Sequence, residues 1–207
     1  SDKLQLSLMA QHVRDDGASG ELWGRRIDSL PDPDDIWLTT VTLPNPYLVS
    51  DNDNVSAVIE YDLGFADLHS ITGYAHSSVN NLDDCAGSPP FSGCARGVDP
   101  LTYEQWSEEI QLISKADDSF DWLIGINFFS GKDSEQFLLS FGPVVVNDAY
   151  STAEETAYAG FGQVSWHIAP LWSVTGGLRL SHDKYRISTV GSGLGDSQEL
   201  AQAEDSG

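Results

Sequence analysis

Basic residues are scarce in this chain. Ten Lys and Arg residues stand against 32 Asp and Glu residues among 207, which gives a formal charge of -22 at pH 7. A surface of this sign repels phosphate backbones and anionic head groups, so the composition excludes nucleic acid as a partner. The hydrophobic fraction of 40% is ordinary for a folded protein, and we expect a packed structure.

Long apolar runs are absent as well. The longest covers residues 122–129 and includes Gly125 and Asn127, whereas a membrane helix needs roughly 20 apolar residues. We therefore expect no transmembrane helix. The chain opens without a signal peptide and closes in a polar run, so we expect both ends to be cut from a longer protein.

Catalytic motifs are also missing. The chain has no G-x-S-x-G elbow, phosphate-binding P-loop, G-x-G-x-x-G, H-E-x-x-H or EF-hand loop. The five His residues are scattered, and no carboxylate pair can be told from chance among 32 acids. We therefore expect neither an enzyme nor a bound cofactor.

Cysteine occurs only twice, at Cys85 and Cys94, in a segment rich in Gly, Pro and Ser. No His or other Cys lies at metal-finger spacing, which predicts a disulfide, with two unrelated free thiols as the alternative. Closing so short a loop would stabilise the fold by roughly 2 to 3 kcal/mol. A disulfide also implies an oxidising compartment such as the periplasm or the cell exterior.

What the chain does have is alternation with a period of two, which is typical of strands with two chemically different faces. In residues 172–183, Val174 and Leu178 share one face, and Thr175 and Arg179 share the other. The same pattern predicts about seven strands, at residues 4–13, 55–63, 66–76, 103–114, 121–130, 157–167 and 172–183.

The predicted connections alternate between short and long. Short turns fall at residues 62–65, 115–120 and 168–171; long polar segments fill 15–54, 77–102, 131–156 and the tail from 187. Outer-membrane barrels have short periplasmic turns and long outer loops in strict succession. A soluble sandwich would show the same alternation, but such long loops are uncommon in one. The pattern predicts an all-β fold, an antiparallel up-and-down transmembrane β-barrel fragment that covers residues 1–207.

Two hairpins resemble those of a known family. Residues 106–129, WSEEIQLIS and then DDSFDWLIGINFF, resemble the hairpin of TonB-dependent receptors written F-S-Q-E-L-R-L-x-S, acidic turn, W-x-x-G-x-Y-F. Residues 158–183, YAGFGQVSW and then LWSVTGGLRLSHD, are similar to that family's Y-A-x-F-G-Q, turn, L-x-x-x-x-G-x-R-x-x-x-D/E. Residues 61–74 give a weaker third match.

The resemblance implies a barrel of about 22 strands closed by a separate plug domain. It further implies the outer membrane of a Gram-negative bacterium, with outer-membrane lipid and the TonB energy-transducing complex as partners. The cargo would be a small nutrient: siderophore-bound iron, cobalamin or an oligosaccharide. Neither the plug nor the terminal aromatic strand is recognisable, so we expect only part of a barrel.

Several loop residues are candidates for binding. Aromatic residues of the long segments could capture a ligand or simply anchor the loops: Trp23, Trp37, Tyr47 and Phe91. Acidic residues there could bind calcium, which prefers oxygen ligands on flexible loops, or could simply be solvated: Asp32, Asp34, Asp35, Asp51 and Asp53.

The polar face of the clearest predicted strand carries Arg179, which we expect to face the lumen and to pair with Glu109 or Asp183. Two other functions stay open at this point. One is a soluble, acidic β-sandwich that acts as a calcium-dependent carbohydrate-binding or adhesion module. The other is a secreted hydrolase. The direction of the apolar faces, toward lipid or toward a protein core, separates these readings.

Overall fold

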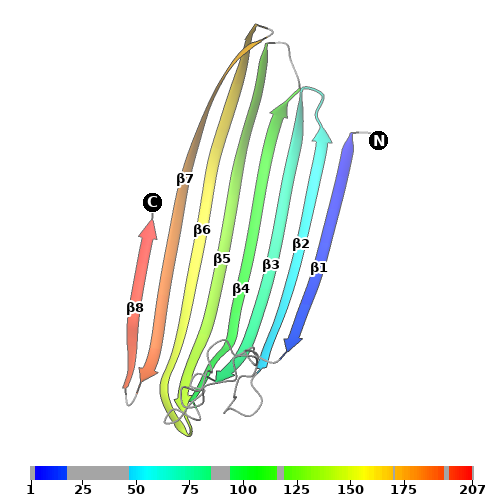
Figure 1. Cartoon of the computed structure of the whole chain (residues 1–207). Coiled ribbons are helices and arrows are strands. Elements are labelled where there is room, and N and C mark those ends of the chain that lie inside the picture. Colours follow the sequence, from blue (N-terminus) through cyan, green and yellow to red (C-terminus); the bar gives the residue numbers. More distant parts are fainter. Residues whose placement is uncertain are drawn as a thin grey trace, which may run out of the picture.

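A computed structural model describes residues 3–17, 47–84, 94–115, 119–169, 171–193 and 196–206. These residues form one antiparallel sheet of eight strands whose order in the sheet is the order in the chain (Figure 1). The strands are β1 (Leu4–Gly17), β2 (Tyr47–Asp62), β3 (Ala66–Asp84), β4 (Cys94–Ser114), β5 (Phe120–Phe141), β6 (Val144–Ala169), β7 (Trp172–Gly193) and β8 (Asp196–Ser206).

The sheet is a single layer. Among the described residues, each strand contacts only its neighbours in the chain, and the only buried hydrophobic residues are Ala66 and Ala159. A sandwich needs a second sheet packed about 10 Å away, and none lies against the described strands. No helix among them is long and apolar enough to cross a membrane. The predicted strand order is confirmed, and the sandwich alternative is wrong for this part of the chain.

The β2–β3, β4–β5 and β6–β7 connections lie at one end of the sheet, the upper end in Figure 1. Between β2 and β3, the Leu63 N–H donates to the Ala66 carbonyl at 2.9 Å. The Gly64 N–H donates to the Asp62 side chain at 2.6 Å. Gly64 has a φ of 90°, a left-handed value that costs glycine little. We call this end of the sheet the turn rim and the opposite end the loop rim.

The predicted long loop at residues 131–156 is wrong. β5 and β6 stay paired along their whole length, and Gly142 and Pro143 alone connect Phe141 to Val144. Gly142 has a φ of 56°, which allows so tight a turn. The segment reads as a loop because it shows no alternation of polar and apolar residues. Lys132, Asp133 and Glu135 place polar groups on both faces, and residues 137–139 and 144–146 are apolar in succession.

The predicted tail from residue 187 is also a strand. β7 continues to Gly193 and β8 pairs with it, from Lys184 opposite Ser206 to Gly193 opposite Asp196. The expected count of seven strands is therefore too low by one. The sequence of β8 also shows no alternation of polar and apolar residues, which concealed this hairpin.

Several predictions fall on residues 18–46 and 85–93, which lie outside the described residues. They concern Cys85 of the predicted disulfide and six loop residues: Trp23, Trp37, Phe91, Asp32, Asp34 and Asp35. Cys94 begins β4, and its bridge to Cys85 stays a prediction.

Candidate functional site

The sheet has two chemically different faces, which its register defines. Residues directly opposite one another in an antiparallel pair point to the same face. One row across the sheet is apolar and reads Leu178, Gly162, Ile124, Leu112, Leu68, Tyr61 and Leu4. The next row is mostly polar and reads Arg179, Phe161, Gly125, Gln111, His69, Glu60 and Gln5. We call these the apolar face and the polar face.

The apolar face is uncovered. Leu8 is 72% exposed, and Leu178 and Leu180 are each 69% exposed. Leu178 is therefore not enclosed between packed sheets. A continuous apolar surface of this extent is unusual for a protein in water, whereas the outer wall of a membrane barrel requires it.

Aromatic residues frame the apolar face at two levels. Near the turn rim, Phe120 and Trp166 stack with ring centroids 6.0 Å apart. Toward the loop rim, Tyr74 lies 6.4 Å from Trp106 by ring centroids. Further members of the turn-side girdle are Tyr61, Trp122 and Trp172, and of the loop-side girdle Phe128 and Tyr158. Transmembrane barrels carry such girdles at both lipid–water interfaces, so the stretch between them, here called the apolar belt, has the design of a membrane-spanning wall.

On the polar face, three strands contribute one stacked unit. Gly125 of β5 lies opposite Phe161 of β6, which lies opposite Arg179 of β7. The Phe161 ring lies so close to Gly125 that a Cβ there would be 2.8 Å from its Cε2 atom. The Arg179 guanidinium carbon lies 5.6 Å from the Phe161 ring centroid, a cation–π distance. The glycine thus makes room for the ring on which the arginine rests.

The expected partners of Arg179 are not the ones the structure shows. Glu109 accepts hydrogen bonds from Gln111 and, at 3.3 Å, from Asn127. Glu109 belongs to β4, three strands away from Arg179, which lies over Phe161 instead. Asp183 is on the same face of β7 as Arg179, opposite Ala157. The predicted pairing with Glu109 is wrong because strand separation prevents it.

A row of alternating charge crosses the apolar face between the belt and the loop rim. Seven strands each contribute one residue, and each residue is directly opposite the next. Three pairs approach closely: His12 Nδ1 to Asp53 Oδ1 at 2.7 Å, Lys132 Nζ to Glu154 Oε1 at 3.1 Å, and His76 Nδ1 to Glu104 Oε1 at 3.6 Å. This charge row comprises His12, Asp53, His76, Glu104, Lys132, Glu154 and Arg186.

The structure corrects the predictions that placed three residues near the charge row in a loop. Asp51, Asp53 and Tyr47 belong to β2 and not to a loop. Asp53 pairs with His12, and Asp51 lies 3.2 Å from Arg14. The described residues contain no group of three or more His, Cys, Asp or Glu side chains that could hold a metal ion. Calcium binding thus stays a prediction for the acidic residues of segment 18–46 alone.

The comparisons with known proteins decide the family. A family model described as TonB dependent receptor-like, beta-barrel matches residues 2–203. The chain belongs to this receptor family. No curated protein matches it. The description of the family is that of a receptor barrel.

Among solved structures, this receptor chain is similar to the ferric yersiniabactin uptake receptor FyuA from Yersinia pestis. The TM-score is 0.80 at 15% sequence identity, over 99% of this chain and 31% of that chain. The shared fold is therefore that of a transmembrane β-barrel. The chain spans about a third of the length of that receptor. The fold class predicted from alternation is confirmed.

Two features of this receptor wall were missed at the level of sequence. The first is the Gly125–Phe161–Arg179 unit, although the two family-like hairpins supply all three residues. The second is Glu108: alternation through Trp106 and Ile110 puts Glu108 on the apolar face and Glu109 on the polar face. The alternation alone could have assigned Glu108 and Glu109 to opposite faces of the strand.

The turn rim carries an ionic cluster outside the belt. Lys115 lies 3.2 Å from Asp62 and also contacts Asp67. The Gly64 N–H, and after it Lys115, lowers the pKa of Asp62 below its ordinary 3.8. The hydrogen bond to Asp67 raises the pKa of Lys115 above its ordinary 10.5.

The directions of the two pKa shifts define the pH range in which this cluster stabilises the fold. A lowered carboxyl pKa gives stability that is present above the ordinary value and is lost as the pH falls through the folded-state pKa. A raised Lys pKa gives stability that is present below 10.5 and is lost as the pH rises through the folded-state pKa. Asp62 and Lys115 therefore both contribute to stability between the ordinary pKa of the carboxyl group and that of the Lys115 ammonium.

Substituting Lys115→Met should raise the pKa of Asp62 but leave it below 3.8, because the Gly64 N–H, the larger cause, remains. Carboxyl NMR titration of the receptor labelled at Asp would measure this. Lys3→Met is the control, because Lys3 lowers the pKa of Asp62 less than Gly64 and Lys115 do. An Asp62 pKa that does not move in Lys115→Met would contradict the described contact.

In the charge row, Lys132→Glu should weaken the β4–β5–β6 pairing, because it places like charges opposite Glu104 and Glu154. Cross-strand charge pairs are worth roughly 0.2 to 1 kcal/mol each, so amide hydrogen exchange in residues 130–134 should quicken by about two- to fivefold. Lys132→Gln should show a smaller increase. The difference should shrink in 1 M salt, where charges are screened within about 3 Å; an effect independent of salt would speak against the charge pairing.

Proposed function

We propose that this chain is part of the barrel wall of a receptor in the outer membrane of a Gram-negative bacterium, where it imports a scarce nutrient. The observation that carries the proposal is the apolar belt framed by two aromatic girdles on a sheet of the TonB-dependent receptor family. The belt would meet outer-membrane lipid. The polar face would line the lumen, with Arg179, Glu109 and Asp183 along it.

Siderophore-bound iron is the cargo that we place first. The solved structure that shares this fold is that of a ferric yersiniabactin uptake receptor. Cobalamin and oligosaccharides are the other cargo classes of the proposal. Energy would come from the TonB complex, which would act through the plug domain of the receptor.

Capture would take place at the loop rim, which we place outside the cell. Aromatic residues there would contact the ligand: Trp23, Trp37, Tyr47 and Phe91. A disulfide between Cys85 and Cys94 would hold one of these loops, and calcium would order another through Asp32, Asp34 and Asp35. Calorimetry of the full receptor with calcium alone tests the last point, and no heat of binding would remove it.

Uptake by cells that make the full receptor tests the function. The probes are radioactive iron loaded on catecholate, hydroxamate and phenolate siderophores, labelled cobalamin, and labelled oligosaccharides. We expect one probe to accumulate only in cells with an energised inner membrane. A protonophore, which collapses that energy, is the control. Binding of none of the probes at the cell surface would refute import of these classes, whereas binding without accumulation would refute energised transport.

A further inference from the structure

A single carboxylate interrupts the apolar belt. Glu108 lies between Trp106 and Ile110 on the apolar face of β4. In the described strands it is the only Asp, Glu, Lys or Arg side chain on this face from the turn-side girdle up to the row that holds Phe128 and Tyr158. The related hairpin pattern has Gln at this position. Ionisable residues inside a membrane are costly and mark functional sites.

Two hydroxyl groups of the neighbouring strand donate to the Glu108 carboxylate. The Ser70 hydroxyl donates to its Oε1 atom at 2.8 Å, and the Thr72 hydroxyl donates to its Oε2 atom. Both donors belong to β3, so a small polar notch spans β3 and β4. An ionised carboxylate accepts about four hydrogen bonds, which leaves capacity for a further donor from the membrane side.

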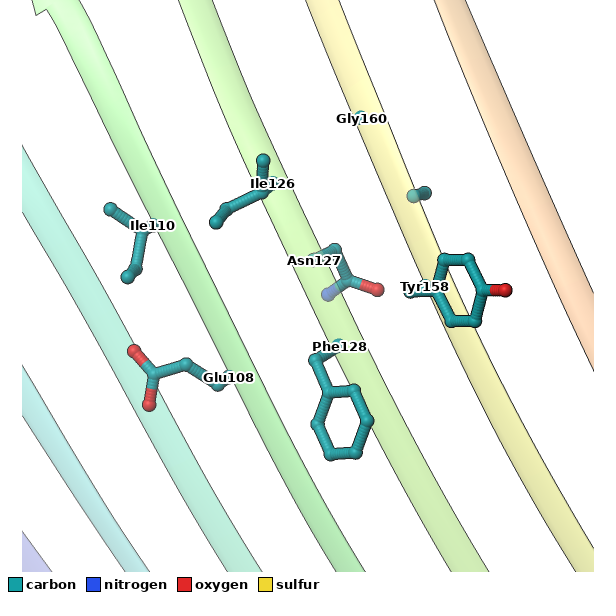
Figure 2. A pocket seen from close by; sticks show the side chains of 8 residues that line it. Glu108, Ile110, Ile126, Asn127, Phe128, Tyr158 and Gly160 are labelled. Atoms are coloured by element: carbon teal, nitrogen blue, oxygen red, sulfur yellow. The ribbon is translucent and has the colours of Figure 1, made fainter.

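An apolar groove of about 370 Å³ adjoins this notch. Figure 2 shows Glu108 and Ile110 at one side of it and Tyr158 and Gly160 at the other, with Ile126 and Phe128 between them. Gly160 forms an open part of this surface, because a Cβ there would meet no atom within 4 Å. The groove is thus wide enough for a hydrocarbon chain beside a charged end.

We propose that Glu108 and this groove bind a membrane lipid whose head group carries a primary ammonium. Charge complementarity selects the head group, because a carboxylate attracts an ammonium and repels an anionic head. Position supports it as well, since Glu108 lies directly opposite Phe128 of the loop-side girdle, and this girdle marks the level of the head groups. From there the acyl chain would run along Ile110 and Ile126 into the space over Gly160. The inference rests on the belt facing lipid and holds for any cargo.

Native mass spectrometry of the full receptor in mild detergent tests the site. The probes are phosphatidylethanolamine, which has a primary ammonium, phosphatidylcholine, which lacks N–H donors, and anionic phosphatidylglycerol. Lipid A with and without an ethanolamine substituent is a second matched pair. We expect the member of each set that carries a primary ammonium to be retained most strongly.

Two variants separate the two parts of the site. Glu108→Gln keeps the shape, and we expect it to lower retention of phosphatidylethanolamine about tenfold, which corresponds to about 1.4 kcal/mol. Gly160→Leu should fill the groove, because the Cβ position of Gly160 is open, and should lower retention of all three phospholipids alike. Glu109→Gln, on the polar face of the same strand, is the control and should leave the retention of all three phospholipids unchanged.

Equal retention of phosphatidylethanolamine by Glu108→Gln and the unmodified receptor would overturn the proposal. Preferred retention of phosphatidylglycerol, or a second receptor copy in place of lipid, would also overturn it and indicate another occupant. Mobility of unheated receptor on a denaturing gel, which reports a folded barrel, verifies that each variant has assembled. The uptake assay is separate, so failure of this site leaves the import proposal standing.

Discussion

Receptor that carries Leu178→Arg should be less stable in the membrane by about 2 to 4 kcal/mol, if the site lies near the bilayer midplane. Leu178 is 69% exposed on the apolar face, in the same row as Ile124 and Leu112. An arginine there would bring a charge into hydrocarbon with no acidic neighbour in that row. The measurement is urea unfolding of the full receptor in lipid vesicles, followed by tryptophan fluorescence.

Thr175→Arg is the matched control, because Thr175 is on the same strand but on the polar face, opposite Ser165. An arginine there would meet water or polar groups, so we expect a change below about 0.5 kcal/mol, as for surface substitutions generally. Equal losses in the two variants would show that the two faces do not differ in their surroundings. The membrane orientation of the sheet would then be wrong.

The sequence predicts the membrane part of this fold well and the part beyond it poorly. Between the girdles, lipid on one side and water on the other impose strict alternation, and every predicted strand there is present in the predicted order. Beyond the loop-side girdle, polar groups on both faces remove the periodic signal. The extensions of β5 and β6 and the whole of β8 were therefore mistaken for loops.

Individual contacts across the sheet were less predictable than strands, because they depend on register. Asp53 was expected in a calcium-binding loop, whereas it lies opposite His12 in the charge row. Arg179 was expected to find a carboxylate, and it lies over Phe161. In both cases the partner is far away in the chain and becomes a neighbour only when the register of each hairpin is fixed.

The second large effect should come from Gly125→Val on the polar face. Its side chain would collide with the Phe161 ring, which passes within 2.8 Å of the Cβ position at Cε2 and closer still at its tip. The ring would have to leave, and its contact with Arg179 would go with it. Overpacking of this kind costs about 1 to 3 kcal/mol, measurable by the same urea unfolding.

A double-mutant cycle identifies the cause of that loss. In a Phe161→Ala background no ring remains to collide with, so Gly125→Val should cost little; contacting residues show such coupling, whereas distant ones add. Gly160→Ala is the control: Gly160 neighbours Phe161 on β6, but its Cβ would meet no atom within 4 Å. We expect that variant to be neutral or slightly stabilising, because Gly in a strand interior is destabilising by roughly 0.5 to 1 kcal/mol relative to Ala. If Gly125→Val costs the same with and without Phe161, the ring is not what the glycine accommodates.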